Sequence, residues 1–420
     1  MSITYYPPFG ASPDFPLNVS LGGTNTDAFG RLRTSVPYTL FDSQNRYAPD
    51  NQFDTSTATG GSTTHLPNEA TVRMDVTTSS GSGVVRQTYR SFSYQSGKGL
   101  LIFATFVMNA AKTNLRQRVG YFGSQNGIYF QLNDSTKSFV IRTYIGGSVD
   151  DTTRKVDQSS WNGDKLDGTG PSGLTLDLTA PQIFWTDIEW LGVGSVRCGF
   201  IINGKFYVCH TFHTSNITGF SAVYMTTATL PVRYEITNTG TTASASYLKQ
   251  ICSSVMSEGG YEQYSPSHIA RRLTKLSNIQ GTFLPLVSIR MTSSTLGAVI
   301  IPGRMQVLPT TSQEYEVGLF QNSTLTGASW SAVASDSNVE QDTSATAMTG
   351  GTLVQTDYVS SSGSGGIQPL VDPAGYNWAI QLGTSIAGVS DILTLAIRLV
   401  DSTTPQGSAL GAIAFWDLTQ

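Results

Sequence analysis

The chain consists largely of short apolar runs separated by clusters of Gly, Ser, Thr, Asn and Pro. In the clearest run, 392–400, every second residue from Leu393 to Leu399 is Leu or Ile, and smaller or polar residues lie between them. A period of two residues is the pattern of a β-strand with one buried face. No segment has the apolar period of a long amphipathic helix. The sequence therefore predicts an all-β protein built from antiparallel sandwiches or jelly rolls.

The predicted strands form two series, and a chain of 420 residues is long for one compact core. We expect a first sandwich over 69–256, a connector over 257–282 that could hold a short helix after Pro266, and a second sandwich over 283–420. The first series comprises 71–77, 84–92, 99–109, 118–122, 127–132, 138–144, 174–178, 183–191, 195–202, 205–212, 222–226 and 232–237. The second comprises 283–291, 305–308, 315–320, 353–359, 378–382, 392–400 and 409–418.

Residues 1–68 lack the apolar density of a domain. They are rich in Pro, Gly, Asn and Thr, and their hydrophobic residues occur singly. Such a segment cannot bury enough apolar surface to offset its own ordering entropy. We expect an extended N-terminal arm that orders against its own sandwich or a neighbouring subunit. The residues expected to attach it are Phe29, Arg31, Arg33, Tyr38 and Phe41.

An Asn-Gly pair at 203–204 lies between two strand-like runs and predicts a β-hairpin, because both central positions of a type I′ turn need positive φ. Pairing Ile202 with Lys205 places Cys198 opposite Cys209, with Cα atoms roughly 5.5 Å apart. The distance permits a disulfide, but assembly in a reducing cytoplasm favours two free thiols. Both faces of the hairpin are apolar in this register. The hairpin is therefore either central and covered on both sides, or a bulge breaks its register.

The segment WTDIEWLG, residues 185–192, carries Asp187 and Glu189 on one face of a strand. Paired carboxylates beside aromatic rings are what a glycosidase uses for catalysis. The segment resembles the active-site strand of concanavalin-like β-jelly-roll glycoside hydrolases, which places Glu, Asp and Glu on alternate residues, and this likeness implies a concanavalin A-like first sandwich. Trp185 stands where the nucleophilic Glu should be, so we expect a structural strand. Hydrolysis by Asp187 and Glu189, and a non-catalytic sugar cleft, stay open as alternatives.

The glycine-rich loop 162–173 carries Asp164 and Asp167. Clustered carboxylates can bind calcium, but this spacing is not that of an EF-hand, so an ordinary turn without metal or other cofactor is the prediction and calcium the alternative. If the first sandwich binds a glycan, these two aspartates together with Trp161 and Tyr129 are the expected contacts.

Motifs of the known catalytic classes are missing from the sequence. It contains no G-x-S-x-G, no Walker loop and no H-E-x-x-H. His210 and His213 are three residues apart and would point to opposite faces of a strand, which argues against a shared zinc ion. We therefore expect a protein that is not an enzyme.

Composition narrows the choice of partners. The formal net charge is -4, which gives no electrostatic reason to expect nucleic acid. Charged residues make up 13% of the chain, against roughly 25% in an average soluble protein. A surface of hydroxyl and amide groups is typical of many extracellular and virion proteins. The longest apolar run, 100–108, is far shorter than the ~20 residues that span a bilayer, and no signal-peptide pattern follows Met1, so we expect no membrane partner.

Three segments resemble a family of virion structural proteins found in tailed phages of aquatic bacteria and in some large viruses of algae. The likeness extends from about Thr24 to Leu418. It implies a component of the virion exterior, either capsid-associated or part of the tail, which assembles in the host cytoplasm with other virion proteins and forms homo-oligomers. A receptor-binding or tail-fibre protein that binds host surface glycan is the alternative, and a polysaccharide depolymerase is a further one. The segments are DAFGRLRTSVPYTLFDSQNRY at 27–47, WNGDKLDGTGPSGLTLDL at 161–178 with the following WTDIEWLG, and NSTLTGASWSAV at 322–333.

Overall fold

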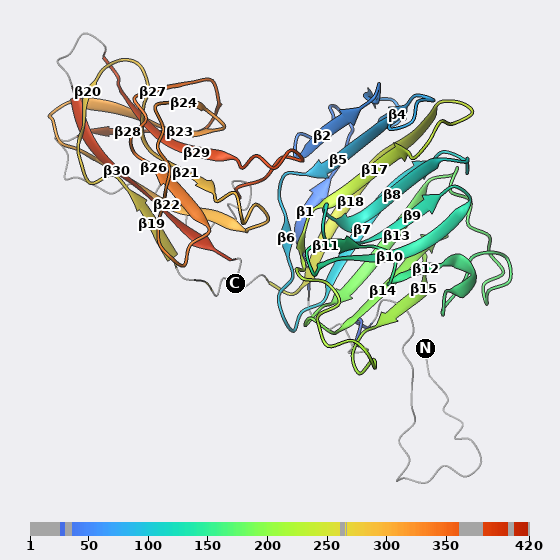
Figure 1. Cartoon of the computed structure of the whole chain (residues 1–420). Helices are drawn as coiled ribbons and strands as arrows, with labels where there is room; N and C mark the ends of the chain where they lie inside the picture. Colours follow the sequence, from blue (N-terminus) through green and yellow to red (C-terminus); the bar gives the residue numbers. More distant parts are fainter. Residues whose placement is uncertain are drawn as a thin grey trace, which may run out of the picture.

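The protein is built from β-strands arranged in two sandwiches that lie beside each other (Figure 1). The structure, a computed structural model, describes residues 26–29, 36–260, 265, 267–360, 381–401 and 407–418. In these ranges the helical element is the short 3-10 turn Gln158–Ser160, and no helix is long and apolar enough to cross a bilayer. The predicted all-β architecture of two antiparallel sandwiches is confirmed.

Two eight-stranded antiparallel sheets form the first sandwich. Sheet A has the order β15-β14-β13-β7-β18-β4-β3, and β1 pairs with the second half of β18. Sheet B has the order β11-β10-β9-β8-β17-β5-β2, and β12 pairs with β10. Sheet A contains β1 (Pro37–Ser43), β3 (Ser62–Leu66), β4 (Thr71–Val76), β7 (Leu100–Met108), β13 (Gln182–Glu189), β14 (Ser195–Ile202), β15 (Lys205–His213) and β18 (Ser246–Glu258). Sheet B contains β2 (Phe53–Ala58), β5 (Gly83–Thr88), β8 (Leu115–Phe122), β9 (Gly127–Asn133), β10 (Thr136–Ile145), β11 (Ser148–Asp150), β12 (Lys155–Asp157) and β17 (Val232–Asn238). A separate pair is β6 (Phe92–Ser93) with β16 (Thr229–Leu230).

Aromatic side chains fill the space between sheets A and B. The rings of Phe130 and Phe200 meet edge to face with centroids 5.2 Å apart. Phe184 from β13 and Phe139 from β10 stack with centroids 6.0 Å apart. These contacts join the two sheets, and each buried ring contributes both apolar area and a directed contact.

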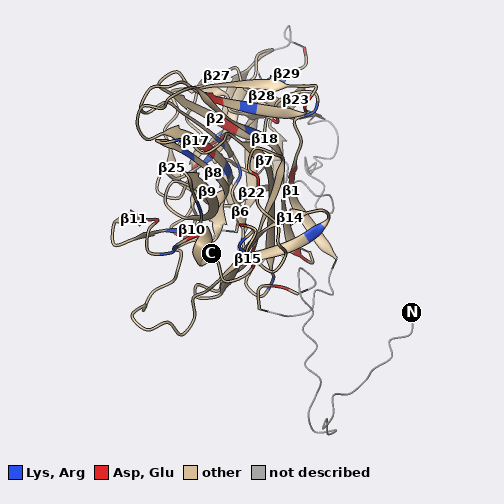
Figure 2. Ribbon diagram, turned by 90° about the vertical axis from the view of Figure 1, so that its right-hand side faces the viewer, with Lys and Arg blue, Asp and Glu red and all other residues tan. Residues whose placement is uncertain are grey.

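A six-stranded and a four-stranded sheet form the second sandwich. The larger sheet has the order β25-β26-β21-β29-β23-β28, and in the smaller one β19, β20 and β22 all pair with β30. The larger sheet contains β21 (Leu284–Met291), β23 (Glu314–Gln321), β25 (Ser331–Ala332), β26 (Val339–Asp342), β28 (Thr352–Ser360) and β29 (Ile392–Leu399). The smaller contains β19 (Ser267–Arg271), β20 (Leu276–Ile279), β22 (Ile300–Pro309) and β30 (Gly407–Asp417), and β24 (Thr324–Thr326) pairs with β27 (Ala347–Thr349). Figure 2 shows a mainly tan ribbon on which Lys, Arg, Asp and Glu are scattered in short coloured segments, in keeping with the 13% of charged residues.

The N-terminal region differs from the predicted extended arm. Residues 37–66 form β1, β2 and β3 within the sheets of the first sandwich. Phe41 and Phe53 explain this, because both rings are buried in the core between the sheets and lie 6.0 Å apart. An arm can therefore include only residues before 37. Arg31 and Arg33 lie outside the described residues, as do 1–25 in general.

The predicted connector over 257–282 is also wrong for much of its length. Residues 267–271 and 276–279 are strands β19 and β20, and both pair with β30 in the second sandwich. The short helix expected after Pro266 is thus a strand. Its alternate residues His268 and Ala270 are buried, which is the pattern of a half-buried strand and not of a helix.

The predicted hairpin forms at 203–204, and the structure decides between its two alternatives. Ile202 pairs with Lys205, but the register shifts at Cys198, which faces His210 and not Cys209. Since β15 is an edge strand of sheet A, the hairpin is not central, and a bulge breaks its register between Cys198 and Gly199. Both thiols are free and buried. Burial raises the pKa of Cys198 to about 12, so this thiol stays protonated.

Candidate functional site

The two carboxylates of WTDIEWLG lie on the outer face of sheet A, opposite the core. Phe184 and Ile188 on the same strand point into the core. Asp187 and Glu189 are nevertheless fully buried. Residues from the start of the described chain lie against this face, since Arg197 on β14 donates a hydrogen bond to the carbonyl of Thr26. The strand therefore does not present its acids to solvent.

Asp187 forms an ion pair with Arg197, its direct cross-strand partner on β14. Arg197 Nε donates to Asp187 Oδ2 at 3.1 Å. A buried carboxylate held by a guanidinium is stabilised in its ionised form and is costly to separate from its partner. Asp187 is thus held in a buried ion pair.

Glu189 lies beside two further carboxylates, those of Asp27 and Glu258. Among the described residues, these three carboxylates each have an oxygen atom within 4.8 Å of an oxygen atom of the other two. Each carboxylate accepts a hydrogen bond from the protein: Glu189 from the hydroxyl of Tyr94 at 3.2 Å, Asp27 from the amide of Phe29 at 2.9 Å, and Glu258 from the amide of Gly99 at 3.1 Å. Burial and the neighbouring Glu189 raise the pKa of Tyr94 to about 12, so its hydroxyl remains a donor.

The residues expected to contact a glycan are placed apart and are mostly inaccessible. Trp161 is buried and stacks on Phe139 with centroids 4.3 Å apart. Tyr129 is also buried, on the outer face of sheet B. A sugar stacks on an exposed ring face, so neither buried ring offers a stacking platform in this structure.

The two aspartates of the loop 162–173 hold its turns. Asp164 is buried and accepts hydrogen bonds from the amides of Leu166 at 3.0 Å and Ser172 at 2.8 Å. Asp167 is exposed and accepts from the amide of Thr169 at 2.9 Å. The carboxylate oxygens thus replace backbone acceptors in tight turns, as aspartates commonly do.

His210 and His213 also have separate partners. The Nδ1 of His210 accepts a hydrogen bond from the amide of Asn162 at 3.2 Å, and the Nδ1 of His213 lies 3.2 Å from Ser195 Oγ. Burial lowers the pKa of His210 to about 4, so its ring is neutral near pH 7.

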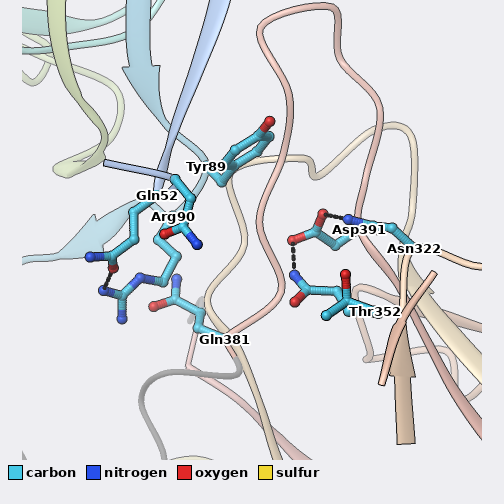
Figure 3. A pocket seen from close by; sticks show the side chains of 9 residues that line it. Gln52, Tyr89, Arg90, Asn322, Thr352, Gln381 and Asp391 are labelled. Carbon is cyan, nitrogen blue, oxygen red and sulfur yellow. Dashed lines mark hydrogen bonds between the residues drawn. The ribbon is translucent and has the colours of Figure 1, made fainter. Parts of the chain in front are cut away.

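A polar cleft of about 340 Å³ lies where the two sandwiches meet (Figure 3). Its walls come from both sandwiches, and side chains with amide, hydroxyl or charged groups dominate its lining. The lining residues are Asn51, Gln52, Tyr89, Arg90, Gln321, Asn322, Thr352, Gln381 and Asp391.

Hydrogen bonds fix both walls of this cleft. On the second sandwich, the carboxylate of Asp391 accepts from Gln321 Nε2 at 3.1 Å, Asn322 Nδ2 at 2.8 Å and the amide of Gly383 at 2.9 Å. On the first sandwich, Arg90 Nη2 donates to Gln52 Oε1 at 2.6 Å. A site whose side chains are already held loses little conformational entropy when a ligand binds.

The segment 381–386 of the second sandwich contacts the first and closes the cleft on one side. The amide of Thr384 donates to the carbonyl of Tyr89 at 2.8 Å, and that of Ile386 donates to Asp54 Oδ2 at 2.7 Å. Gly383 permits this approach, because a Cβ at that position would lie 2.7 Å from the Cβ of Tyr89.

The chemistry of the cleft is that of a hydrogen-bonding site with one aromatic wall. Burial, with the nearby carboxylates of Asp54 and Asp391, raises the pKa of Tyr89, so its phenol is a neutral donor. Burial lowers the pKa of Arg90, which still remains a cation near pH 7. Neutral amides, hydroxyls and one guanidinium can pair with the hydroxyl groups of a saccharide, and the half-buried Tyr89 ring offers an apolar surface.

Comparisons with known proteins give partial structural likenesses. No family model and no curated protein matches the sequence. A protein of unknown function from Shewanella oneidensis MR-1 has a TM-score of 0.36 and 9% identity, over 54% of this chain and 89% of its own. The conserved carbohydrate esterase of the Shiga toxin-encoding bacteriophage phi24B has a TM-score of 0.32 and 11% identity, over 54% of this chain and 100% of its own. The CBM2 module of the evolved Dit protein of Lactobacillus casei BL23 phage J-1 has a TM-score of 0.33 and 7% identity, over 54% of this chain and 99% of its own. All three TM-scores lie below 0.5, so these likenesses assign no function to the chain.

Proposed function

We propose that this chain is a non-enzymatic structural protein on the exterior of a phage particle, and that it binds glycan in the cleft between its two sandwiches. The cleft carries the proposal, because its lining is polar, fixed and open to solvent. Clefts at domain junctions with a few convergent polar groups are common ligand sites. The aspartate in it is already held by three donors, so hydrogen bonds to a ligand would come from the amide and hydroxyl groups of the lining.

A binding role without hydrolysis is consistent with the state of the two acids that suggested a glycosidase. Asp187 pairs with Arg197, and Glu189 accepts a hydrogen bond from Tyr94, both out of reach of solvent. Glycosidases need two accessible carboxylates on either side of the scissile bond. A depolymerase is therefore the weaker candidate.

The placement on a particle rests on the sequence resemblance to virion structural proteins. The low charge content supports it, because a hydroxyl- and amide-rich exterior suits a protein exposed outside cells. In this proposal residues before 37 form the attachment arm, and neighbouring virion proteins or further copies of this chain are its partners.

Removing the aromatic wall or a polar contact of the cleft should weaken glycan binding. We expect Tyr89→Ala and Thr352→Ala each to lower affinity about 5- to 150-fold, since losing one such contact costs about 1–3 kcal/mol and 1.4 kcal/mol is tenfold. The measurement is binding of purified protein to a printed array of bacterial surface polysaccharides, followed by titration against the best binder.

Tyr358→Ala is the matched control. This tyrosine is 63% exposed on β28 and does not line the cleft, so its removal should leave affinity unchanged. If the wild type, Tyr89→Ala and Thr352→Ala bind glycan equally, the cleft is not the glycan site. Hydrolysis of a bound polysaccharide would overturn the proposal that the protein is not an enzyme.

Deleting residues 1–25 should abolish incorporation into particles while the purified protein stays folded, because both sandwiches lie after this segment. Quantitative protein analysis of purified virions measures incorporation and also copy number. Hundreds of copies per particle would favour a capsid coat, and a few dozen or fewer a tail or vertex component. Normal incorporation of the shortened protein would exclude the arm as the attachment device.

A further inference from the structure

An arginine cluster covers part of the outer face of sheet B, opposite the aromatic core. Arg116 and Arg118 lie on β8, Arg233 on the neighbouring β17, and Arg142 on β10. Glu235 on β17, directly across from Arg118 in the register, is the acceptor for three of them. Its carboxylate lies 3.0 Å from Arg233, 3.4 Å from Arg116 and 3.5 Å from Arg118.

A second carboxylate, that of Asp151, lies in a cradle formed by Arg118, Arg142 and Tyr129. Asp151 Oδ2 is 3.2 Å from Arg142 Nη2, 3.4 Å from Arg118 Nη2 and 3.3 Å from the hydroxyl of Tyr129. Both guanidinium groups also lie over the Tyr129 ring, each 5.1 Å from its centroid. One carboxylate oxygen thus accepts hydrogen bonds from three donors.

The cluster has more positive than negative charge. Four arginines pair with two carboxylates, Glu235 and Asp151, within the described part of the chain. Arg118 and Arg142 are 7% and 6% exposed, so water does little to screen them. The side chains of Arg116 and Arg233 are 29% and 12% exposed, so the excess positive charge lies toward the solvent edge of the cluster, where it attracts an anion.

Two donors of the cluster also lack an acceptor. The buried Nε atoms of Arg142 and Arg116 make no hydrogen bond. Each such group costs free energy, and most buried donors in proteins are paired. The Nε and Nη edge of a guanidinium is the edge that binds a carboxylate with two parallel hydrogen bonds, and in Arg142 half of that edge is unused.

Asp151 belongs to a peripheral segment that can leave the cradle without disturbing the core. Its side chain is 32% exposed, and it lies between β11 and β12, which pair with β10 at the edge of sheet B. Strand β11 has three residues and follows a Gly146-Gly147 turn in which both residues have positive φ. A short edge strand on a glycine turn is among the least stable parts of a fold.

We propose that the cradle of Arg118, Arg142 and Tyr129 is a binding site for the carboxylate of an acidic saccharide, and that Asp151 occupies it in the absence of ligand. The site is distinct from the cleft between the sandwiches. Asp151 itself supplies the evidence for a carboxylate ligand, since a carboxylate already fits the three donors. That the ligand is a saccharide, such as a uronic acid polymer, rests on the proposed glycan-binding function.

Releasing Asp151 should therefore expose the site. We expect Asp151→Asn to bind trigalacturonate at least tenfold more tightly than the wild type, by titration calorimetry at low salt, and to lose this gain when Arg142→Gln is added. Trigalacturonate should also raise the melting temperature of Asp151→Asn more than that of the wild type, because a ligand that binds the folded state stabilises it.

Asp157→Asn is the matched control for loss of one negative charge. Asp157 lies on the adjacent β12 and pairs with Lys155 and Ser138, outside the cradle, so its replacement should give no gain. Four outcomes would each overturn the proposal. The affinity for trigalacturonate could rise equally in Asp157→Asn, or rise less than twofold in Asp151→Asn. The gain in Asp151→Asn could persist when Arg142→Gln is added, or inorganic phosphate could bind Asp151→Asn as tightly as trigalacturonate does. The neutral galactose trimer tests the cleft separately: its binding should depend on Tyr89 and not on Asp151, so the two proposals can fail independently.

Discussion

Arg197→Leu should destabilise the first sandwich by about 3–5 kcal/mol, the usual cost of leaving one member of a buried ion pair alone. Asp187 is fully buried on β13, and its carboxylate would lose the guanidinium that neutralises it. The substitution also removes the donor to the Thr26 carbonyl, so residues 26–29 should detach from sheet A. Urea denaturation followed by circular dichroism measures the free energy of unfolding.

A second substitution separates loss of the pair from loss of packing. Asp187→Asn combined with Arg197→Leu removes both charges, so it should recover more than half of the stability lost in the single variant. Arg73→Ala is the surface control. Its pair with Asp75 is partly exposed, with side chains 40% and 29% exposed, so the change should be within about 0.5 kcal/mol. A loss of less than about 1 kcal/mol in the free energy of unfolding of Arg197→Leu would show that water reaches the Asp187 carboxylate and that the pair is not buried.

Trp161→Ala should cost about 3–5 kcal/mol, the range for deleting a large aromatic side chain from a core. The indole is buried, stacks on Phe139 and donates through Nε1 to the carbonyl of Val156 at 3.2 Å. Thermal and urea unfolding of the variant measure the loss, and glycan binding by the remaining folded protein should equal that of the wild type.

Trp330→Ala provides the comparison for this prediction. Trp330 is half-buried in the second sandwich and lies under the guanidinium of Arg290, 4.2 Å from the ring centroid. Its loss should cost about 1 kcal/mol, the size of a partly exposed cation–π contact. If Trp161→Ala instead kept its stability and lost glycan binding, Trp161 would be a sugar platform after all.

Local sequence chemistry predicted the hairpin well because its determinants are local. The Asn-Gly pair dictates the turn, and the turn sets the register of the residues next to it. The four pairs nearest the turn match the prediction, and it fails at the fifth, where the bulge puts His210 opposite Cys198. The apolar pattern on both faces signalled a bulge or a central position, but choosing between them required the strand order, which depends on residues far away in the chain.

The strand β18 could not be found from periodicity, although it lies inside sheet A. Its buried residues alternate from Ser246 to Gln250 and again from Ser253 to Ser257, and the irregularity between Gln250 and Ser253 changes the phase. Several of these buried residues are serines, so neither hydrophobicity nor a constant period marks the strand. Tertiary pairing on both edges, with β7 on one side and β4 and β1 on the other, supplies the stabilisation that the side chains lack.

The cleft could not be predicted from the sequence either, because its residues come together only in the folded structure. The cleft combines short segments near positions 52, 90, 321, 352, 381 and 391, and none of them has a motif of its own. Conversely, Asp187 and Glu189 looked catalytic because their spacing on one strand is visible in the sequence, whereas Arg197 and Tyr94, which engage them, come from other segments.

The connectivity of β18 has a consequence for the order in which the protein folds. Its residues pair with β1 at Pro37 to Ser43 and with β4 at Val72 to Val76, which the ribosome produces about two hundred residues earlier. Sheet A therefore cannot close during synthesis until residue 258 has emerged, and β1 and β4 lack their shared partner β18 until then. Contacts so distant in sequence carry a large loop-closure entropy and slow the folding transition. Unpaired strand edges and exposed apolar faces promote aggregation, so we expect the nascent chain to be most prone to aggregate during this interval.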